Sequence, residues 1–297
     1  MNALPTLRQL QFFLALVQRQ SFSKAAEDCL VSQSTLSSAI KELEALLETQ
    51  LVDRSTRVFG LTPAGEDVAR RASEIMAHVE DMRRAVADRR PLEGPFHLGV
   101  IPTIAPFLLP RAAAALEAAY PNLQLYLRED RSEALVERMA NGALDAALLA
   151  FPYEAPGIDH VEIGRDAFVL AAPEGHPFAA RKTVSISDLK KADILLLEDG
   201  HCLRDHAIEA CKLRDPDTAA TFGATSLFTL IQMVRAGLGV TLLPEMAVTE
   251  GLSKTETLAI LPFESSSVAR TIGVAWRRGS GRGEEARAVA KTIAAVF

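Results

Sequence analysis

Apolar residues recur at helical spacing through the first third of the chain. From 7 to 18 they stand at positions 7, 10, 13, 14 and 17 with polar residues between them, which predicts an amphipathic helix. Serines at the starts of 23–30 and 34–48 predict two further helices. Short helices joined by a tight turn, here at 31–33, are typical of a helix-turn-helix.

A wing and a long helix are predicted next. The segment 51–61 holds β-forming residues around Gly60 and predicts a small hairpin. Pro63 suits the first position of a helix that continues to about residue 90. Apolar residues at 68, 72, 75, 79, 82 and 86 suit a seam against a partner helix, so we expect a linker and dimerisation helix. The alternative is a helix that lies on its own domain.

Beyond a Pro- and Gly-containing break at 91–95, strands and helices alternate, which predicts an α/β domain. The expected helices cover 107–120 and 134–141. The expected strands cover 96–100, 123–127, 144–149, 167–172, 194–197, 240–243 and 271–276. We therefore divide the chain into a winged helix-turn-helix (1–62), a linker helix (63–90) and a regulatory domain (91–297).

Charge places any DNA-binding surface in the N-terminal third. The net charge is -6, but residues 1–90 hold 12 Lys or Arg against 12 Asp or Glu, so the rest of the chain carries the whole negative excess. No targeting peptide is recognisable, and no uncharged apolar run reaches about 18 residues. We expect a cytoplasmic protein without a membrane partner.

Polar side chains cluster at the start of the helix after the predicted turn. In a helix-turn-helix this helix enters the major groove, where Gln pairs with adenine, hydroxyls reach bases or phosphates, and Lys reaches phosphate. The expected DNA contacts are Gln33, Ser34, Thr35, Ser37, Ser38 and Lys41, with Arg54 and Arg57 in the wing. An ordinary three-helix bundle has the same apolar spacing and remains the alternative.

One long pattern joins these elements. It consists of Phe22-Ser23, Ala25-Ala26, Ser32-Gln33-Ser34, Leu36-Ser37, Leu43-Glu44, Arg54, Leu61-Thr62 and Gly65. The pattern resembles the N-terminal domain of LysR-type transcription regulators, with Glu48 and Val52 departing from the family's usual Gly and Phe. The resemblance implies promoter DNA and RNA polymerase as partners.

The three cysteines, Cys29, Cys202 and Cys211, are too few for a secreted disulfide framework. Cys29 falls on an apolar helical face and is expected to pack as a small hydrophobe. Cys202 follows a strand and a turn near a helix start. There the helix N-terminus and the neighbouring His201 and Arg204 would favour the thiolate.

Cys211 lies nine residues beyond Cys202. If the segment between them is helical, the two are about 900° apart around the axis and about 13.5 Å apart along it. A disulfide requires Cα atoms within roughly 7 Å, so oxidation would unwind the helix and act as a signal. The alternatives are two unrelated buried cysteines, or a zinc site of Cys202, His206 and Cys211, whose spacing fits no common ligand pattern.

The surroundings of the cysteines carry a second resemblance. The matching residues are Gly200-His201-Cys202-Leu203-Arg204-Asp205, Cys211, Ala224-Thr225-Ser226-Leu227, Gly237, Gly239 and Thr241-Leu242-Leu243-Pro244. They are similar to the peroxide-sensing OxyR branch of the LysR-type regulators. The resemblance implies that Cys202 reacts with hydrogen peroxide to a sulfenic acid, that Cys211 resolves it to a disulfide, and that cellular dithiol reductants reverse the change.

The same resemblance places Thr103 and Arg270 in a peroxide pocket, with Asp205 holding Arg204. A helix cap is the alternative role for Thr103. It also implies a homotetramer and a regulatory domain like periplasmic binding proteins, with subdomain I at about 95–165 and 268–297 and subdomain II at about 166–267.

Three other functions remain open. They are a LysR-type regulator of a small anionic effector bound near Ser226, a thiol peroxidase and a transport binding protein. The last is disfavoured because no export signal is present. We expect no cofactor, no metal and no enzymatic activity.

Overall fold

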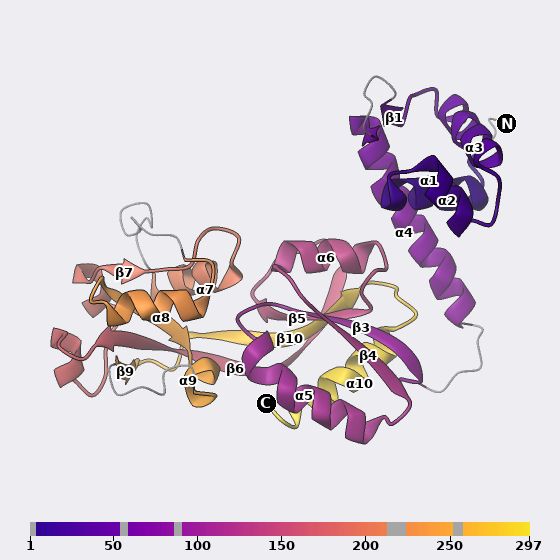
Figure 1. Cartoon of the computed structure of the whole chain (residues 1–297). Helices are drawn as coiled ribbons and strands as arrows, with labels where there is room; N and C mark the ends of the chain where they lie inside the picture. Colours follow the sequence, from indigo (N-terminus) through magenta and orange to yellow (C-terminus); the bar gives the residue numbers. More distant parts are fainter. Residues whose placement is uncertain (1–3, 54–58, 86–90, 213–223, 252–257) are drawn as a thin grey trace. The chain divides into compact units, whose positions relative to one another are not determined.

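The computed structural model describes residues 4–53, 59–85, 91–212, 224–251 and 258–297 (Figure 1). Its contacts separate into two compact units, one holding Met1–Asp88 and the other nearly all of the remaining chain. Within these ranges no helix combines the length and apolar content that crossing a bilayer requires.

Three helices form the core of the first unit, and each begins at a capping hydroxyl. The side chains of Thr6, Ser21 and Ser32 accept a backbone N–H from the first turn of the helix that follows. The predicted second and third helices therefore begin one residue earlier than expected. The helices are α1 (Leu7–Arg19), α2 (Phe22–Asp28) and α3 (Gln33–Leu46).

The wing and the long helix follow in the predicted order. Strands β1 (Val52–Asp53) and β2 (Gly60–Leu61) pair antiparallel, and α4 (Pro63–Ala85) begins at the predicted proline. Ala72 of α4 is buried in the core of its own unit, whereas Ile75 and Met82 are 44% and 63% exposed. The helix thus packs on its own domain near its start and leaves apolar side chains exposed further along.

The second unit is built on one mixed sheet of order β4-β3-β5-β10-β6-β8-β7, with β9 also paired to β6. Strand β3 pairs parallel with β4 and β5, and β10 pairs antiparallel with β5 and β6. Its first strands are β3 (Gly94–Val100), β4 (Leu123–Glu129) and β5 (Ala146–Phe151). The others are β6 (Ile158–Pro173), β7 (Ile194–Leu195), β8 (Val240–Pro244), β9 (Leu258–Pro262) and β10 (Ala269–Arg277).

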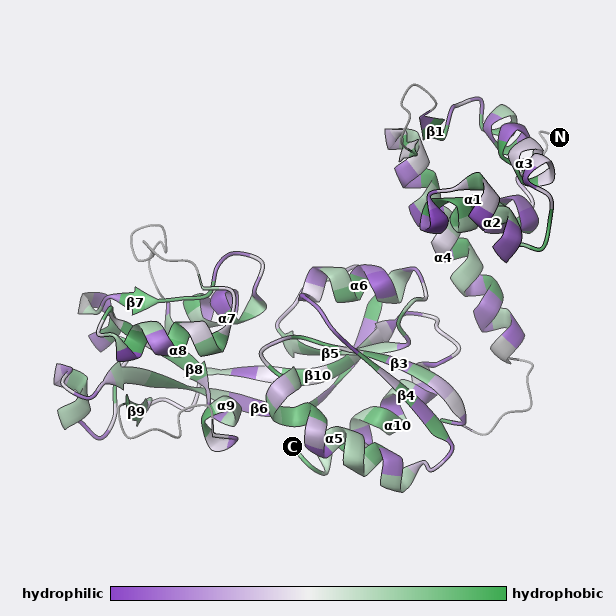
Figure 2. Cartoon of the chain, viewed as in Figure 1, coloured by the Kyte–Doolittle hydropathy of each residue, from purple (hydrophilic) through white to green (hydrophobic). Residues whose placement is uncertain are grey.

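Helices pack against the sheet, and the buried apolar residues form two separate clusters. One hydrophobic cluster lies around β3, β5 and β10 with α5 and α10, and the other around β6, β7 and β8 with α7 and α8. Figure 2 shows hydrophobic residues concentrated on β5, β7 and β8. The helices are α5 (Ala105–Ala119), α6 (Ser132–Ala140), α7 (Cys202–Cys211), α8 (Leu227–Arg235), α9 (Glu245–Thr249) and α10 (Gly283–Ala294).

The long strand β6 joins the two halves. Its first part pairs with β10, and its last residues pair with β8 and β9. Only 167–172 was predicted as a strand, because the earlier residues alternate with charged side chains and are mostly half-exposed. The first part of β6 packs in one core and its last part in the other, so the domain has two subdomains.

Candidate functional site

Cys202 is the first residue of α7, and His201 is the N-cap, so the predicted helix start is confirmed. The thiol borders a small cavity, with room of about 10 Å³ for the centre of a water-sized molecule. Ile101, Pro102, Thr103, Arg131, Ser132, Gly200 and His201 complete its lining. A cavity of this size holds about one water molecule, so a larger organic acid does not fit in it.

A buried arginine organises one wall of the cavity. Arg270 is 1% exposed and pairs with the equally buried Asp166, with 2.9 Å between Nη2 and Oδ2. Its Nη1 donates to the Thr103 hydroxyl at 2.8 Å, and its Nη2 donates to the Thr103 carbonyl at 3.0 Å. The Thr103 hydroxyl accepts from a cation and so keeps its own proton to donate toward the cavity. Thr103 does not cap α5, whose N-cap is Ile104 without a side-chain cap bond.

Two further polar groups face the cavity without partners. The Ser132 hydroxyl and His201 Nε2 are both buried, and neither has a hydrogen-bond partner of ordinary geometry among the described residues. Burying an unsatisfied polar group is costly, which makes both atoms candidates for binding a small polar molecule. Sequence reasoning missed Ser132, since a serine at the start of α6 reads as an ordinary helix-start residue.

The expectation that His201 and Arg204 favour the thiolate form of Cys202 is wrong. Burial raises the pKa of Cys202, and the nearby Ser132 hydroxyl and Arg270 guanidinium oppose that rise. Burial also lowers the pKa of His201, which is therefore neutral at pH 7 and supplies no positive charge. The thiol thus rests in its protonated form, and the cation that favours its ionisation is Arg270 in place of His201 and Arg204.

Arg204 is oriented away from its predicted partner. Its Nε pairs with Asp199 Oδ1 at 2.9 Å and its Nη1 donates to the Leu197 carbonyl at 3.3 Å. The prediction that Asp205 holds Arg204 is therefore wrong. Neighbouring residues on a helix do not face each other, and Asp205 is exposed on α7. Arg204 instead ties the start of α7 to the segment that precedes it.

Cys211 ends the same helix in a different environment. It is buried in the hydrophobic cluster around β6 and β8, whereas Cys202 belongs to the cluster around β3 and β5. Burial raises the pKa of Cys211 to about 12. The helix assumed in the sequence analysis is present, so the two Cα atoms are about 13.5 Å apart along its axis and a bond between them requires α7 to unwind.

His206 anchors the middle of α7. Its Nε2 donates to the Pro152 carbonyl at 2.8 Å, and its Nδ1 has no partner among the described residues. The zinc alternative lacks support, because the described residues contain no group of three or more His, Cys, Asp or Glu that could hold a metal ion.

A pH dependence of stability follows from this histidine. Burial lowers the pKa of His206 below its value in the unfolded chain, so the unfolded state binds more protons at acid pH. The free energy of unfolding is then highest above about pH 6.5 and falls as the pH drops further. We expect the Tm to fall between pH 7.5 and 5.5, and to fall less in His206→Gln, whose amide can still donate to Pro152. Equal slopes for the two proteins would contradict this role of His206.

The predicted DNA-reading face lies on α3. Gln33, Ser34, Thr35, Ser38 and Lys41 are exposed, and Ser37 is half-buried. Ser32 fixes the first turn, with its hydroxyl 2.9 Å from that of Ser34 and 2.7 Å from that of Thr35. Arg54 and Arg57 lie outside the described residues. Cys29 lies at the end of α2 and contacts the helical core.

Comparison with known proteins shows which family the chain belongs to. Residues 7–66 match the model of the bacterial regulatory helix-turn-helix proteins of the lysR family, and residues 89–297 match the LysR substrate binding domain. The chain belongs to the LysR family of transcription regulators. As predicted, this LysR-type regulator has a helix-turn-helix domain followed by a two-subdomain α/β regulatory domain like those of periplasmic binding proteins.

Relatives of this LysR-type regulator include named peroxide regulators. It is 40% identical to a probable hydrogen peroxide-inducible genes activator of Mycobacterium avium, over 97% of this chain and 93% of that protein. It is 38% identical to the transcriptional regulator EstR of Acinetobacter baylyi, over 94% and 93%. A full-length OxyR variant from Pseudomonas aeruginosa superposes with a TM-score of 0.81 at 32% identity, covering 98% of both chains.

Proposed function

We propose that this LysR-type regulator senses hydrogen peroxide through Cys202 and Cys211 and controls oxidative-stress genes. The observation that carries the proposal is the cavity beside Cys202, which is sized for one small polar molecule and is lined by Ser132 and by His201, whose Nε2 has no hydrogen-bond partner among the described residues. The similarity to peroxide-inducible activators supports the same reading. The chain is about equally similar to EstR, whose name states no peroxide signal. Similarity alone therefore does not identify the signal, and the proposal rests on the chemistry of this cavity.

The first step oxidises Cys202. The neutral His201 is the base in the cavity that can accept the thiol proton, and the sulfur then attacks one peroxide oxygen. The O–O bond breaks, a sulfenic acid forms, and the other oxygen leaves as hydroxide and takes up a proton to become water. Hydroxyl donors from Thr103 and Ser132, the former backed by Arg270, stabilise the negative charge on the leaving oxygen.

The second step moves the helix. The Cys211 sulfur attacks the sulfenic sulfur, the S–O bond breaks and a second water leaves, so two thiols and one peroxide yield one disulfide and two waters. This bond cannot form while α7 is intact, because its ends lie in separate cores. Cellular dithiol reductants reverse the reaction by thiol–disulfide exchange.

The proposal extends to the assembly. The exposed Ile75 and Met82 on α4 suit pairing with a second copy of the chain, and two linked DNA-binding domains raise affinity for paired half-sites. We propose a homo-oligomer, a tetramer by family resemblance, that acts with RNA polymerase at promoter DNA in the cytoplasm. The division into 1–62, 63–90 and 91–297, with subdomain II at about 166–267, belongs to this proposal.

The competing functions have weaker support. A larger anionic effector does not fit the cavity at Cys202. A thiol peroxidase would destroy peroxide in large molar excess when given a reductant. The helix-turn-helix domain at residues 7–66 favours a regulator, which needs to react only once per activation.

Replacing Cys211 with serine separates the two chemical steps. Without the resolving thiol, peroxide should leave Cys202 as a sulfenic acid that dimedone traps at about one equivalent per chain. The wild-type protein should show little adduct, because the sulfenic acid is consumed by the disulfide. An unmodified Cys202 in the Cys211→Ser variant would refute the proposal, and Cys29→Ser serves as the matched control that behaves as wild type.

A further inference from the structure

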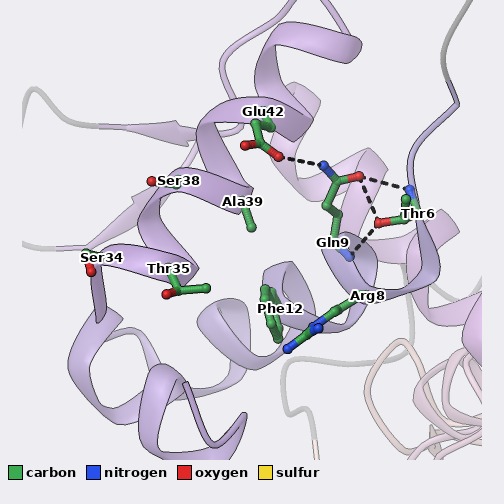
Figure 3. A pocket seen from close by; sticks show the side chains of 9 residues that line it. All are labelled: Thr6, Arg8, Gln9, Phe12, Ser34, Thr35, Ser38, Ala39 and Glu42. Carbon is green, nitrogen blue, oxygen red and sulfur yellow. Dashed lines mark hydrogen bonds between the residues drawn. The ribbon is translucent and has the colours of Figure 1, made fainter. Parts of the chain in front are cut away.

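A groove of about 590 Å³ opens between α1 and α3 in the first unit (Figure 3). One wall is lined by Ser34, Thr35 and Ser38 from α3, and the other by Arg8 and Phe12 from α1. Ser34 and Ser38 already belong to the predicted DNA-reading face, so the groove continues that face toward α1. About half of its lining is polar, a larger share than in the largely apolar pockets that hold small organic ligands.

Arg8 places an exposed positive charge at this groove. Its guanidinium lies 5.3 Å from the centre of the Phe12 ring, and Phe12 itself is buried, so the arginine is held in place by a fixed aromatic face. Among the described residues the structure gives Arg8 no carboxylate partner, and the side chain is exposed. An exposed arginine that is stacked on an aromatic ring and has no carboxylate partner among the described residues is suited to bind a phosphate.

Glu42 brings the opposite charge to the same groove. The side-chain Nε2 of Gln9 donates to Glu42 Oε2 at 3.4 Å. The side-chain Oε1 of Gln9 accepts from the backbone N–H and the hydroxyl of Thr6 at 2.9 and 3.0 Å (Figure 3). This chain of contacts joins the cap of α1 to α3. A phosphate strand that entered the groove beside Glu42 would be repelled, so the charges favour the Arg8 side.

We propose that this groove receives one phosphate strand of DNA, with Arg8 bound to a phosphate and Glu42 keeping the strand away from its own side. The inference deepens the helix-turn-helix function of the family and does not depend on peroxide sensing. It adds Arg8 as a positioning residue to the contacts predicted from α3. Because phosphates are the same in every sequence, Arg8 should contribute affinity without sequence preference.

The test measures DNA affinity of the full-length reduced chain against salt concentration. The probes are a random-sequence duplex and a duplex that the wild-type protein selects from a random pool. Arg8→Gln removes one phosphate contact per engaged domain, so the slope of log K against log salt should become shallower by about 0.9 for each domain. The same relation gives a loss of about eightfold per domain at 0.1 M salt that vanishes toward 1 M, and it should be equal for both probes.

Arg19→Gln is the matched control, because it makes the same charge change on α1 about 16 Å further along the helix, at an exposed pair with Asp28. It should leave the slope unchanged, and Glu42→Gln should bind both probes more tightly than wild type. The proposal fails if Arg8→Gln matches Arg19→Gln, or if it weakens only the selected duplex, which would indicate base reading. A wild-type protein without salt-dependent binding would refute the DNA-binding assignment itself.

Discussion

Replacing Cys202 with serine is expected to abolish the peroxide-dependent change in DNA binding while leaving the binding of untreated protein as in wild type. Serine differs by one atom at the first residue of α7, so the helix and its cap are retained. Its hydroxyl cannot form a sulfenic acid or a disulfide. Without the disulfide, α7 should stay helical after peroxide is added. The loss should be complete, because burial raises the pKa of both remaining thiols, Cys29 and Cys211, the latter to about 12.

The measurement is the dissociation constant for the selected duplex before and after one equivalent of peroxide. Wild type should change its affinity, and the ratio for Cys202→Ser should be one. The matched control is Cys29→Ser, which removes the half-buried thiol of the DNA-binding domain and should respond as wild type does. A Cys202→Ser protein that still responds would mean that the signal is a ligand or another residue.

Replacing Arg270 with methionine is expected to lower both stability and reactivity. The change leaves Asp166 as a buried charge without its cation, which costs about 3–5 kcal/mol. For a domain of this size that corresponds to a fall in Tm of roughly 10 °C. Thr103 also loses its donor and Cys202 loses the cation that favours its ionisation, so oxidation by peroxide should slow by at least about tenfold. Thermal unfolding and the rate of loss of alkylatable Cys202 measure the two effects.

A second substitution separates these effects. In Arg270→Met with Asp166→Leu both buried charges are gone, so the Tm should recover much of its loss, since apolar replacement of a buried ion pair is often close to neutral. The reaction with peroxide should stay slow, because Thr103 still lacks its donor. Recovery of the rate together with the Tm would show that Arg270 is only structural and would remove it from the site.

Sequence periodicity predicted many of the elements that are buried throughout or on one regular face, although it missed the helices α8 and α10, which also bury one regular face. Strand β5 is buried at every position and the helices of the first unit alternate regularly, so both gave clear signals. The first part of β6 was missed because it is half-exposed and charged, and β9 because its apolar residues are mostly half-buried. These strands are defined by pairing with distant partners, which a local pattern does not report.

Only those residues of the site that belong to a local sequence motif could be predicted. Cys202 and Cys211 stood out through their neighbours, but Arg270 meets Thr103 across 167 residues and Asp166 across 104, so only family resemblance suggested Arg270 and nothing suggested Asp166. The sign of the effect on the Cys202 pKa was wrong because the sequence shows neighbouring cations and hides burial. The pairing of Arg204 with Asp205 could have been excluded, since adjacent helical residues point in different directions.

The most direct test of the sensing mechanism is peptide mass spectrometry of the reduced full-length protein after peroxide is added slightly above one equivalent. The mechanism predicts a rapid link between the peptides of Cys202 and Cys211, with Cys29 remaining a free thiol. If Cys202 is still a thiol after this treatment, the peroxide mechanism is wrong and this LysR-type regulator responds to another signal.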